Sequence, residues 1–189
     1  MENIEEIKNM WTELNSRITC LEDDHRRIAR EVTQSKFKTA REKLVAKYKA
    51  FIFIALIMII YMNLYLIHMP DVVEQFRIPA IIYWTCFFLF TAGADTYLML
   101  KVKDIDVYNS SVRDISRQAS HNWKMHKIVL IIGLPLAFGA IFLLSLLLNA
   151  RENIYIIYGI ITGGVVGLVI GIIHLLKFRE YYKLLQTEN

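Results

Sequence analysis

The chain has 189 residues, of which 55% are apolar and 21% are charged, and its formal net charge is +4. This composition excludes a disordered chain, which combines low hydrophobicity with a high net charge. Two cysteines are too few for a small disulfide-rich secreted domain.

A seven-residue repeat runs through the first 32 residues. Its apolar members alternate in steps of three and four, and His25 is the one polar residue in the series. We call eight of these positions the heptad stripe: Ile4, Ile7, Trp11, Leu14, Ile18, Leu21, Ile28 and Val32. The spacing predicts an amphipathic helix that binds a protein partner or a second copy of itself.

Charges beside the heptad stripe favour a parallel pair of helices. With the repeat numbered from its first residue as position a, Arg17 and Glu22 occupy g and e positions, as do Glu31 and Lys36. In a parallel pair these residues place opposite charges across the seam. The alternative is a single amphipathic helix that packs on its own bundle or lies along the membrane, which the bulk of Trp11 favours.

Residues 36–49 are strongly basic and directly precede an apolar run. Their basic residues, against the single acid Glu42, are Lys36, Lys38, Arg41, Lys43, Lys47 and Lys49. Such a segment is attracted to anionic lipid head groups by about 1 kcal/mol per residue, and it is also the ordinary determinant of topology. A nucleic acid is a less favoured partner because no nucleic-acid-binding motif accompanies the segment.

Four apolar runs of 20 to 23 residues follow, at 50–69, 78–100, 128–149 and 154–176. Each is long enough to cross the roughly 30 Å hydrocarbon core of a bilayer as a helix. A soluble bundle is the alternative, but buried helices of this length rarely lack charges. We therefore predict an all-α polytopic membrane protein. Its expected parts are an N-terminal helix at 1–49, a four-span domain at 50–176 with a loop at 101–127, and a tail at 177–189.

Two ionisable residues lie within the apolar runs. Asp95 is in the second run and His174 is in the fourth. An ionisable residue inside a membrane is a functional hypothesis, here a proton or cation site in a small channel or transporter. The structural alternative is an Asp95 side chain capped by Thr91 or Thr96, or paired with His174 or a nearby lysine.

The loop at 101–127 contains a second periodic segment. Its apolar residues step by three and four: Ile105, Tyr108, Val112, Ile115 and Ala119. This spacing predicts a short amphipathic helix at about 104–119, on the same side of the membrane as the N-terminal helix. Two apolar stripes in one compartment indicate helices that pack together or share a partner.

The glycines are confined to the apolar runs. Four of them recur along one face of the last run and form what we call the glycine stripe: Gly159, Gly163, Gly167 and Gly171. Small residues at this spacing allow helices to approach closely in lipid. We expect the glycine stripe to pack within the chain, with a seam between copies as the alternative. Within the second run, the thiol of Cys86 is expected to be free and buried.

The basic residues predict the topology. Of the 22 lysines and arginines, 20 lie before the first run, between the second and third runs, or after the last, and only Arg77 and Arg151 lie elsewhere. The positive-inside rule therefore predicts that both termini and the middle loop are cytoplasmic. The expected location is a bacterial inner membrane, which the chain crosses several times.

The residues capable of chemistry form no catalytic set. No glycine lies outside the apolar runs, so the sequence has no glycine-rich phosphate loop. His25, with Asp23 and Asp24 beside it, offers neither enough ligands nor the spacing of a metal site. We expect neither an enzyme nor a bound cofactor or metal.

Three stretches of the chain resemble uncharacterised four-span membrane proteins of the Bacteroidetes, whose genes often lie beside extracytoplasmic-function sigma factors. These stretches are the opening IEEIKNMWTEL at 4–14, the basic segment at 36–49 and the sequence KVKDIDVYNSSVRDISRQ at 101–118. The resemblance implies a regulatory protein that holds a sigma factor at the membrane. The chain departs from the zinc-containing anti-sigma pattern His-x3-Cys-x2-Cys, which Cys20 and His25 do not match.

The expected function follows from these features together. We expect a non-enzymatic regulatory or scaffold protein whose cytoplasmic helices bind a protein partner or self-associate. A small channel or transporter that uses Asp95 and His174 is the alternative.

Overall fold

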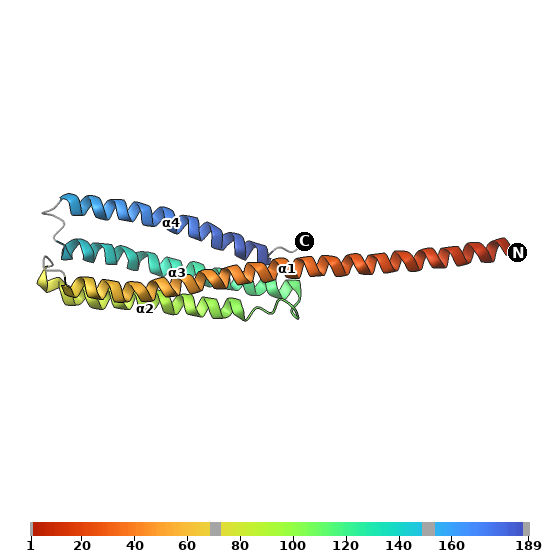
Figure 1. The fold of residues 1–189 in the computed structure, drawn as a ribbon, viewed down its shortest axis with the longest axis horizontal. Coiled ribbons are helices and arrows are strands. Elements are labelled where there is room, and N and C mark those ends of the chain that lie inside the picture. The colour runs from red at the N-terminus through yellow and green to blue at the C-terminus, as the bar shows by residue number, and fades with distance from the viewer. Residues whose placement is uncertain (1, 69–72, 149–153, 187–189) are drawn as a thin grey trace. The chain divides into compact units, whose positions relative to one another are not determined.

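The computed structural model describes residues 2–68, 73–148 and 154–186, with side chains from residue 8 onward. These residues form four helices and no strand: α1 (Glu2–His68), α2 (Glu74–Lys103), α3 (Val112–Leu147) and α4 (Ile154–Gln186) (Figure 1). Each helix is long and apolar enough to cross a membrane. The chain therefore has the predicted all-α architecture of a multi-pass membrane protein.

The chain divides into two units, Met1–Thr39 and Ala40–Asn189, and α1 contributes to both. The first unit is the heptad-bearing part of α1. Within the second unit Ala40, Leu44 and Tyr48 are buried one helical turn apart. Residues 40–49 therefore contribute buried side chains to the second unit, and the division at residue 49 stays a prediction from composition.

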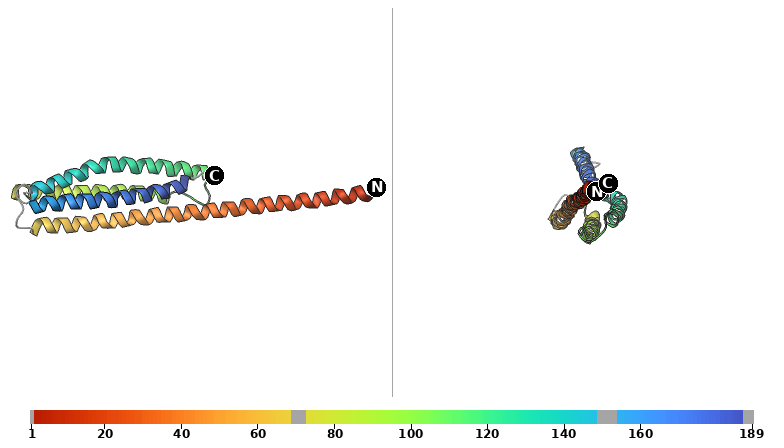
Figure 2. Two further views of the ribbon diagram at one scale, coloured as in Figure 1. Left: turned by 90° about the horizontal axis from the view of Figure 1, so that it is seen from above. Right: turned by 90° about the vertical axis from the view of Figure 1, so that its right-hand side faces the viewer.

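The four helices of the second unit run side by side (Figures 1 and 2). α2 packs against α3, and α3 packs against α4. α1 joins α2 through a polar pair, in which the Asn63 amide donates a hydrogen bond of 3.1 Å to the Thr85 hydroxyl. A small buried core of Leu66, Ala80 and Leu147 connects α1, α2 and α3 at the end where α2 begins.

The predicted short helix at 104–119 is wrong. α2 ends at Lys103, a turn follows, and α3 continues unbroken from Val112 through the third apolar run. The backbone N–H groups of Tyr108 and Asn109 donate hydrogen bonds to the Asp106 carboxylate, at 2.9 and 3.1 Å, and fold the turn.

A side-chain cap then starts α3. The Ser111 hydroxyl accepts a hydrogen bond of 3.1 Å from the backbone N–H of Asp114 and donates one of 2.7 Å to the Asp114 carboxylate. Ile105 in the turn and Ile115 and Ala119 on α3 are buried, whereas Tyr108 and Val112 are exposed. The apolar spacing therefore extends over a turn and the first residues of α3 rather than along one helix.

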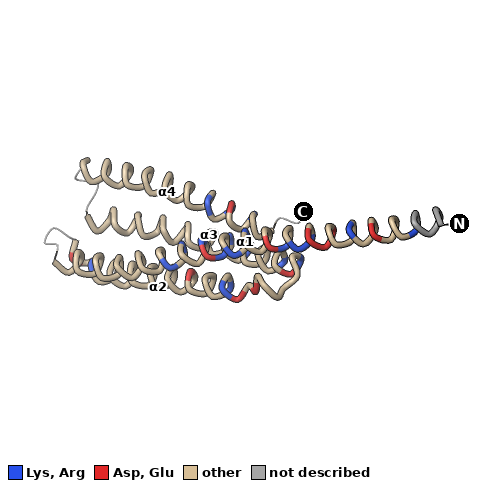
Figure 3. Tube along the Cα trace, turned by 45° about the vertical axis from the view of Figure 1, so that its right-hand side comes forward, with Lys and Arg blue, Asp and Glu red and all other residues tan. Residues whose placement is uncertain are grey.

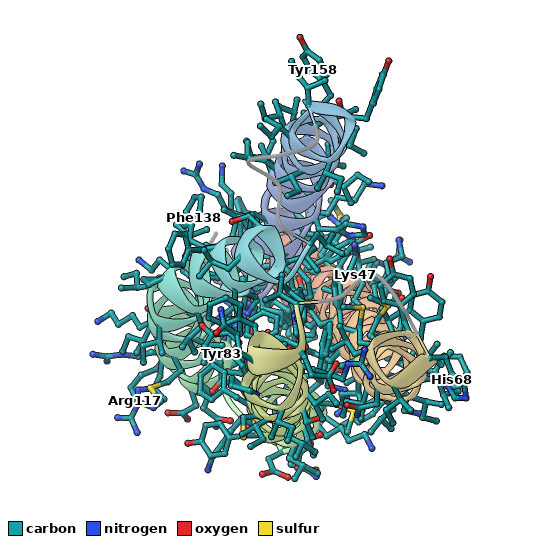
Figure 4. The ribbon with its side chains drawn as sticks, turned by 90° about the vertical axis from the view of Figure 1, so that its left-hand side faces the viewer. Lys47, His68, Tyr83, Arg117, Phe138 and Tyr158 are labelled. Atoms are coloured by element: carbon teal, nitrogen blue, oxygen red, sulfur yellow. The ribbon has the colours of Figure 1, made fainter. Side chains whose placement is uncertain are left out.

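Large apolar side chains cover the outside of the helices. Phe138 and Tyr158 point outward (Figure 4), and each is about 60% exposed. The Cys86 thiol is free, as expected, but it is exposed rather than buried. An exposed apolar surface of this extent suits contact with lipid, because exposing it to water is unfavourable.

Charged residues of the second unit are concentrated in residues 40–49, 101–127 and 177–186, a region that we call the basic end (Figure 3). Hydrogen bonds join these segments: Nη1 of Arg41 donates one of 2.9 Å to the backbone carbonyl of Ile105, and the Ser116 hydroxyl donates one of 3.3 Å to that of Gln186. At the start of α2, Arg77 forms an ion pair of 3.2 Å with Glu74. Arg151 lies outside the described residues.

Candidate functional site

The heptad stripe presents an apolar surface along the first unit. Each of its six members with a described side chain is 47% to 68% exposed: Trp11, Leu14, Ile18, Leu21, Ile28 and Val32. The side chains of Ile4 and Ile7 lie outside the described part of the chain. On the surrounding faces Arg17 pairs with Glu13 at 2.8 Å, one turn apart. The described part of the segment is therefore helical, and these six apolar side chains are exposed on it.

A buried cluster of two tyrosines and a histidine joins three helices at the basic end. The Tyr48 hydroxyl on α1 lies 3.0 Å from Nδ1 of His126 on α3 and 3.1 Å from the Tyr182 hydroxyl on α4. The three side chains are buried. The hydroxyls of Tyr48 and Tyr182 and Nδ1 of His126 each have a hydrogen-bond partner within this trio.

Aromatic rings enclose this cluster. The Phe178 ring lies 4.9 Å from the Tyr48 ring and 4.8 Å from the His126 ring, measured between centroids. Trp123 stacks on His126 at 5.5 Å with an interplanar angle of 18°. The rings exclude water from the hydrogen bonds, which strengthens those bonds and makes an unpaired group there costly.

Burial keeps the cluster uncharged at neutral pH. It lowers the pKa of His126 to about 4 and raises the pKa of Tyr182 to about 12. It also raises the pKa of Tyr48, and the neighbouring Tyr182 adds to that increase. Because none of the three titrates near pH 7, the cluster is suited to fastening α1, α3 and α4 together rather than to proton transfer.

The structure does not join Asp95 to His174. No hydrogen bond or ion pair links them in the described part of the chain, and the buried Nδ1 of His174 has no hydrogen-bond partner there. The His174 ring instead packs edge-on against Phe51 at 5.2 Å. In the described residues the two side chains are therefore not in hydrogen-bond contact, and a proton or cation site at Asp95 and His174 stays a prediction.

Neither threonine beside Asp95 caps it. The Thr91 hydroxyl donates to the backbone carbonyl of Phe88 at 2.9 Å, and the Thr96 hydroxyl donates to that of Ala92 at 2.7 Å. Each hydroxyl has one hydrogen to donate, and both are used within α2. The proposed capping of Asp95 is therefore wrong.

The basic residues of 36–49 have different surroundings. The Lys47 ammonium lies 5.4 Å from the centroid of the Phe178 ring and 5.7 Å from that of Tyr181. The Lys43 ammonium lies 5.8 Å from the same Tyr181 ring. Burial, and then the charge of Lys177, lower the pKa of Lys47. These lysines therefore contribute cation–π contacts to the bundle.

Other members of the segment face outward or reach the loop. Lys36, Lys38 and Lys49 are exposed. Nη1 of Arg41 donates a hydrogen bond of 2.9 Å to the backbone carbonyl of Ile105, which satisfies a carbonyl in the turn after α2. Arg41 thus connects α1 to the turn, a contact that no sequence pattern indicates.

The glycine stripe does not pack within the chain. A methyl group added at any of its four glycines would meet no neighbouring atom within 4 Å. α4 contacts the bundle instead through Phe178, Tyr182 and Leu185, which are buried beyond the end of its apolar run. The expectation of packing within the chain is therefore not met, because only the basic end of α4 is buried in the bundle.

Gly139 on α3 is the glycine that a neighbour approaches closely. A methyl group there would collide with the Tyr83 hydroxyl, which donates a hydrogen bond of 2.9 Å to the backbone carbonyl of Leu136. Tyr83 reaches from α2 to α3 for this contact (Figure 4). The absence of a side chain at Gly139 therefore allows α2 and α3 to pack.

In the described ranges, no three His, Cys, Asp or Glu side chains gather as metal ligands. Comparison of the chain with protein families, with curated proteins and with solved structures finds no match. Its function is therefore inferred from its own residues.

Proposed function

We propose that this chain is a non-enzymatic regulatory or scaffold protein of a bacterial inner membrane, with both termini in the cytoplasm. Its N-terminal helix binds protein through the heptad stripe. The observation that carries the proposal is the exposure of Trp11, Leu14, Ile18, Leu21, Ile28 and Val32 at heptad spacing. Charged residues on the other faces keep this segment out of the hydrocarbon core, so we expect the stripe to be buried against a protein surface.

The charges beside the heptad stripe favour a second copy of the chain as its binding partner. In a parallel pair, Arg17 at position g faces Glu22 at position e of the other copy, and Glu31 faces Lys36 in the same way. In the single chain Arg17 pairs with Glu13 on its own helix, and that exposed ion pair is weak enough to exchange. His25, as a polar residue at position a, restricts the register in which two helices can align.

The test compares two substitutions on opposite faces of one helical turn. Ile18→Asp places a carboxylate in the seam, and Ser16→Asp places one at the outward position f. An unpaired charge in an apolar contact costs about 3 to 5 kcal/mol, so Ile18→Asp should weaken self-association at least about 100-fold. The molar mass of the full chain in detergent, followed by light scattering over a range of concentrations, measures the effect.

The expected result is a dimer for the wild-type chain and for Ser16→Asp, and a monomer for Ile18→Asp. A wild-type chain that is monomeric at every concentration would exclude the second copy as occupant. Binding of a purified extracytoplasmic-function sigma factor to that monomer, lost in Ile18→Asp and retained in Ser16→Asp, would then assign the stripe to the partner that the family resemblance implies.

A further inference from the structure

A cavity of about 360 Å³ lies at the basic end, between α1 and the last residue of α2. Ligand-binding cavities in proteins begin at about this size. Its lining residues are Arg41, Glu42, Val45, Ala46, Lys49 and Lys103. All six belong to the second unit, so the cavity does not depend on the heptad stripe.

The lining is electropositive and partly fixed in place. Three cations line the cavity against one carboxylate, that of Glu42. The Arg41 guanidinium is held by the hydrogen bond from its Nη1 to the Ile105 carbonyl. The nearby carboxylate of Asp106 accepts hydrogen bonds from Asn109 and Tyr108, which together with Arg41 lower its pKa. Lys49 and Lys103 are both exposed, so their positive charge is available to an anion.

The cavity sits where polar sequence meets apolar sequence on both helices. Lys49 directly precedes the apolar run at 50–69, and Lys103 follows the run at 78–100 by three residues. The face of α1 that lines the cavity continues, at steps of three and four, into Phe53, Leu56 and Ile60. These three side chains are all exposed. A ligand with a charged head and an apolar tail would find both surfaces on one helix face.

We propose that this cavity binds the phosphate-bearing head group of an anionic phospholipid. Arg41, Lys49 and Lys103 contact the phosphate oxygens, and the acyl chains lie along Phe53, Leu56 and Ile60. Basic pockets between membrane helices are suited to anionic head groups, and a guanidinium matches the geometry of a phosphate. The site holds a lipid of the surrounding bilayer against α1 and α2.

The experiment titrates the full chain in a zwitterionic detergent with phosphatidylglycerol and with phosphatidylcholine, and native mass spectrometry measures the bound lipid. The pocket variant Lys49→Gln/Lys103→Gln is compared with Arg26→Gln/Arg30→Gln, which removes the same charge from outward positions of the heptad helix. The pocket variant should bind phosphatidylglycerol about 30-fold more weakly, and the control should bind it as the wild-type chain does. Lys49→Arg/Lys103→Arg should retain binding.

Two measurements keep the result interpretable. Thermal unfolding in phosphatidylcholine alone shows whether the pocket variant folds. If that variant does not fold, the single variant Lys103→Gln is used in its place, and its affinity for phosphatidylglycerol should fall about fivefold. A titration with glycerol 3-phosphate separates a lipid from a free phosphate. Equal binding by the pocket variant and the wild-type chain, equal losses in the pocket and control variants, or binding of glycerol 3-phosphate as tight as that of phosphatidylglycerol would each overturn the proposal.

Discussion

The Tyr48 hydroxyl lies 3.0 Å from Nδ1 of His126, and this hydrogen bond connects α1 to α3 across 78 positions of the sequence. Tyr182 brings α4 into the same contact. The basic end is therefore fastened by buried polar groups, while the apolar runs beyond it expose most of their large side chains.

Tyr48→Phe should destabilise the bundle by about 1 to 3 kcal/mol, because it leaves His126 and the Tyr182 hydroxyl buried with one fewer partner. Tyr181→Phe is the matched control, since its ring keeps the contacts with Lys43 and Lys47. Thermal unfolding of the full chain in detergent compares the two. Equal melting temperatures for both variants would show that the Tyr48 hydroxyl does not fasten the helices.

The pH dependence of stability should follow His126. Its pKa is about 4 in the folded chain against about 6.5 when unfolded, so between these values the unfolded chain binds more protons. Stability contributed by the neutral ring is complete above pH 6.5 and is lost as the pH falls toward 4, by on the order of 3 kcal/mol. Melting temperatures measured over this range should fall with pH in the wild-type chain and much less in His126→Gln. A parallel decline in both would assign the effect to other groups.

Gly139→Ala should loosen the packing of α2 on α3 by about 1 to 3 kcal/mol, because the added methyl group would collide with the Tyr83 hydroxyl. Gly163→Ala is the control, since a methyl group there meets no neighbour. The double variant Gly139→Ala/Tyr83→Phe should recover part of the loss. Melting temperatures that change equally at Gly139 and Gly163 would contradict this packing.

The apolar runs were predictable from the sequence because a bilayer admits few structures for 20 residues without charges. The turn at 104–111 was not, since steps of three and four continue across it from Ile105 to Ile115. Residues that share one apolar spacing can thus lie in a turn and in the helix that follows it. Asp106, which folds the turn, and Ser111, which caps α3, are the residues that indicate where the helix begins.

The contacts between helices were not predictable, because composition does not determine how a helix is rotated about its axis. Tyr48 and Tyr182 lie 134 positions apart, and nothing in their spacing indicates that they meet. The same limit applies to Gly163 and Gly139. Both are glycines in apolar runs, but the first faces open space and the second accommodates Tyr83.

The topology can be tested by labelling single cysteines in a Cys20→Ser/Cys86→Ser background. A membrane-impermeant maleimide added to intact cells should label Glu74→Cys, at the start of α2, and spare Lys124→Cys at the basic end. The reason is the excess of Lys and Arg at the basic end, which the positive-inside rule places in the cytoplasm. Disruption of the membrane should make Lys124→Cys reactive. Labelling of Lys124→Cys but not Glu74→Cys in intact cells would reverse the orientation.

The most direct test of self-association through the heptad stripe is cross-linking in native membranes. In the same cysteine-free background, Leu21→Cys lies at position d of the seam and Asp23→Cys at the outward position f. A short bismaleimide should join two copies through Leu21→Cys, should not do so through Asp23→Cys, and should fail at Leu21→Cys when Ile18→Asp is added. Equal cross-linking at both positions, or none at Leu21→Cys, would contradict pairing of the N-terminal helices through the stripe.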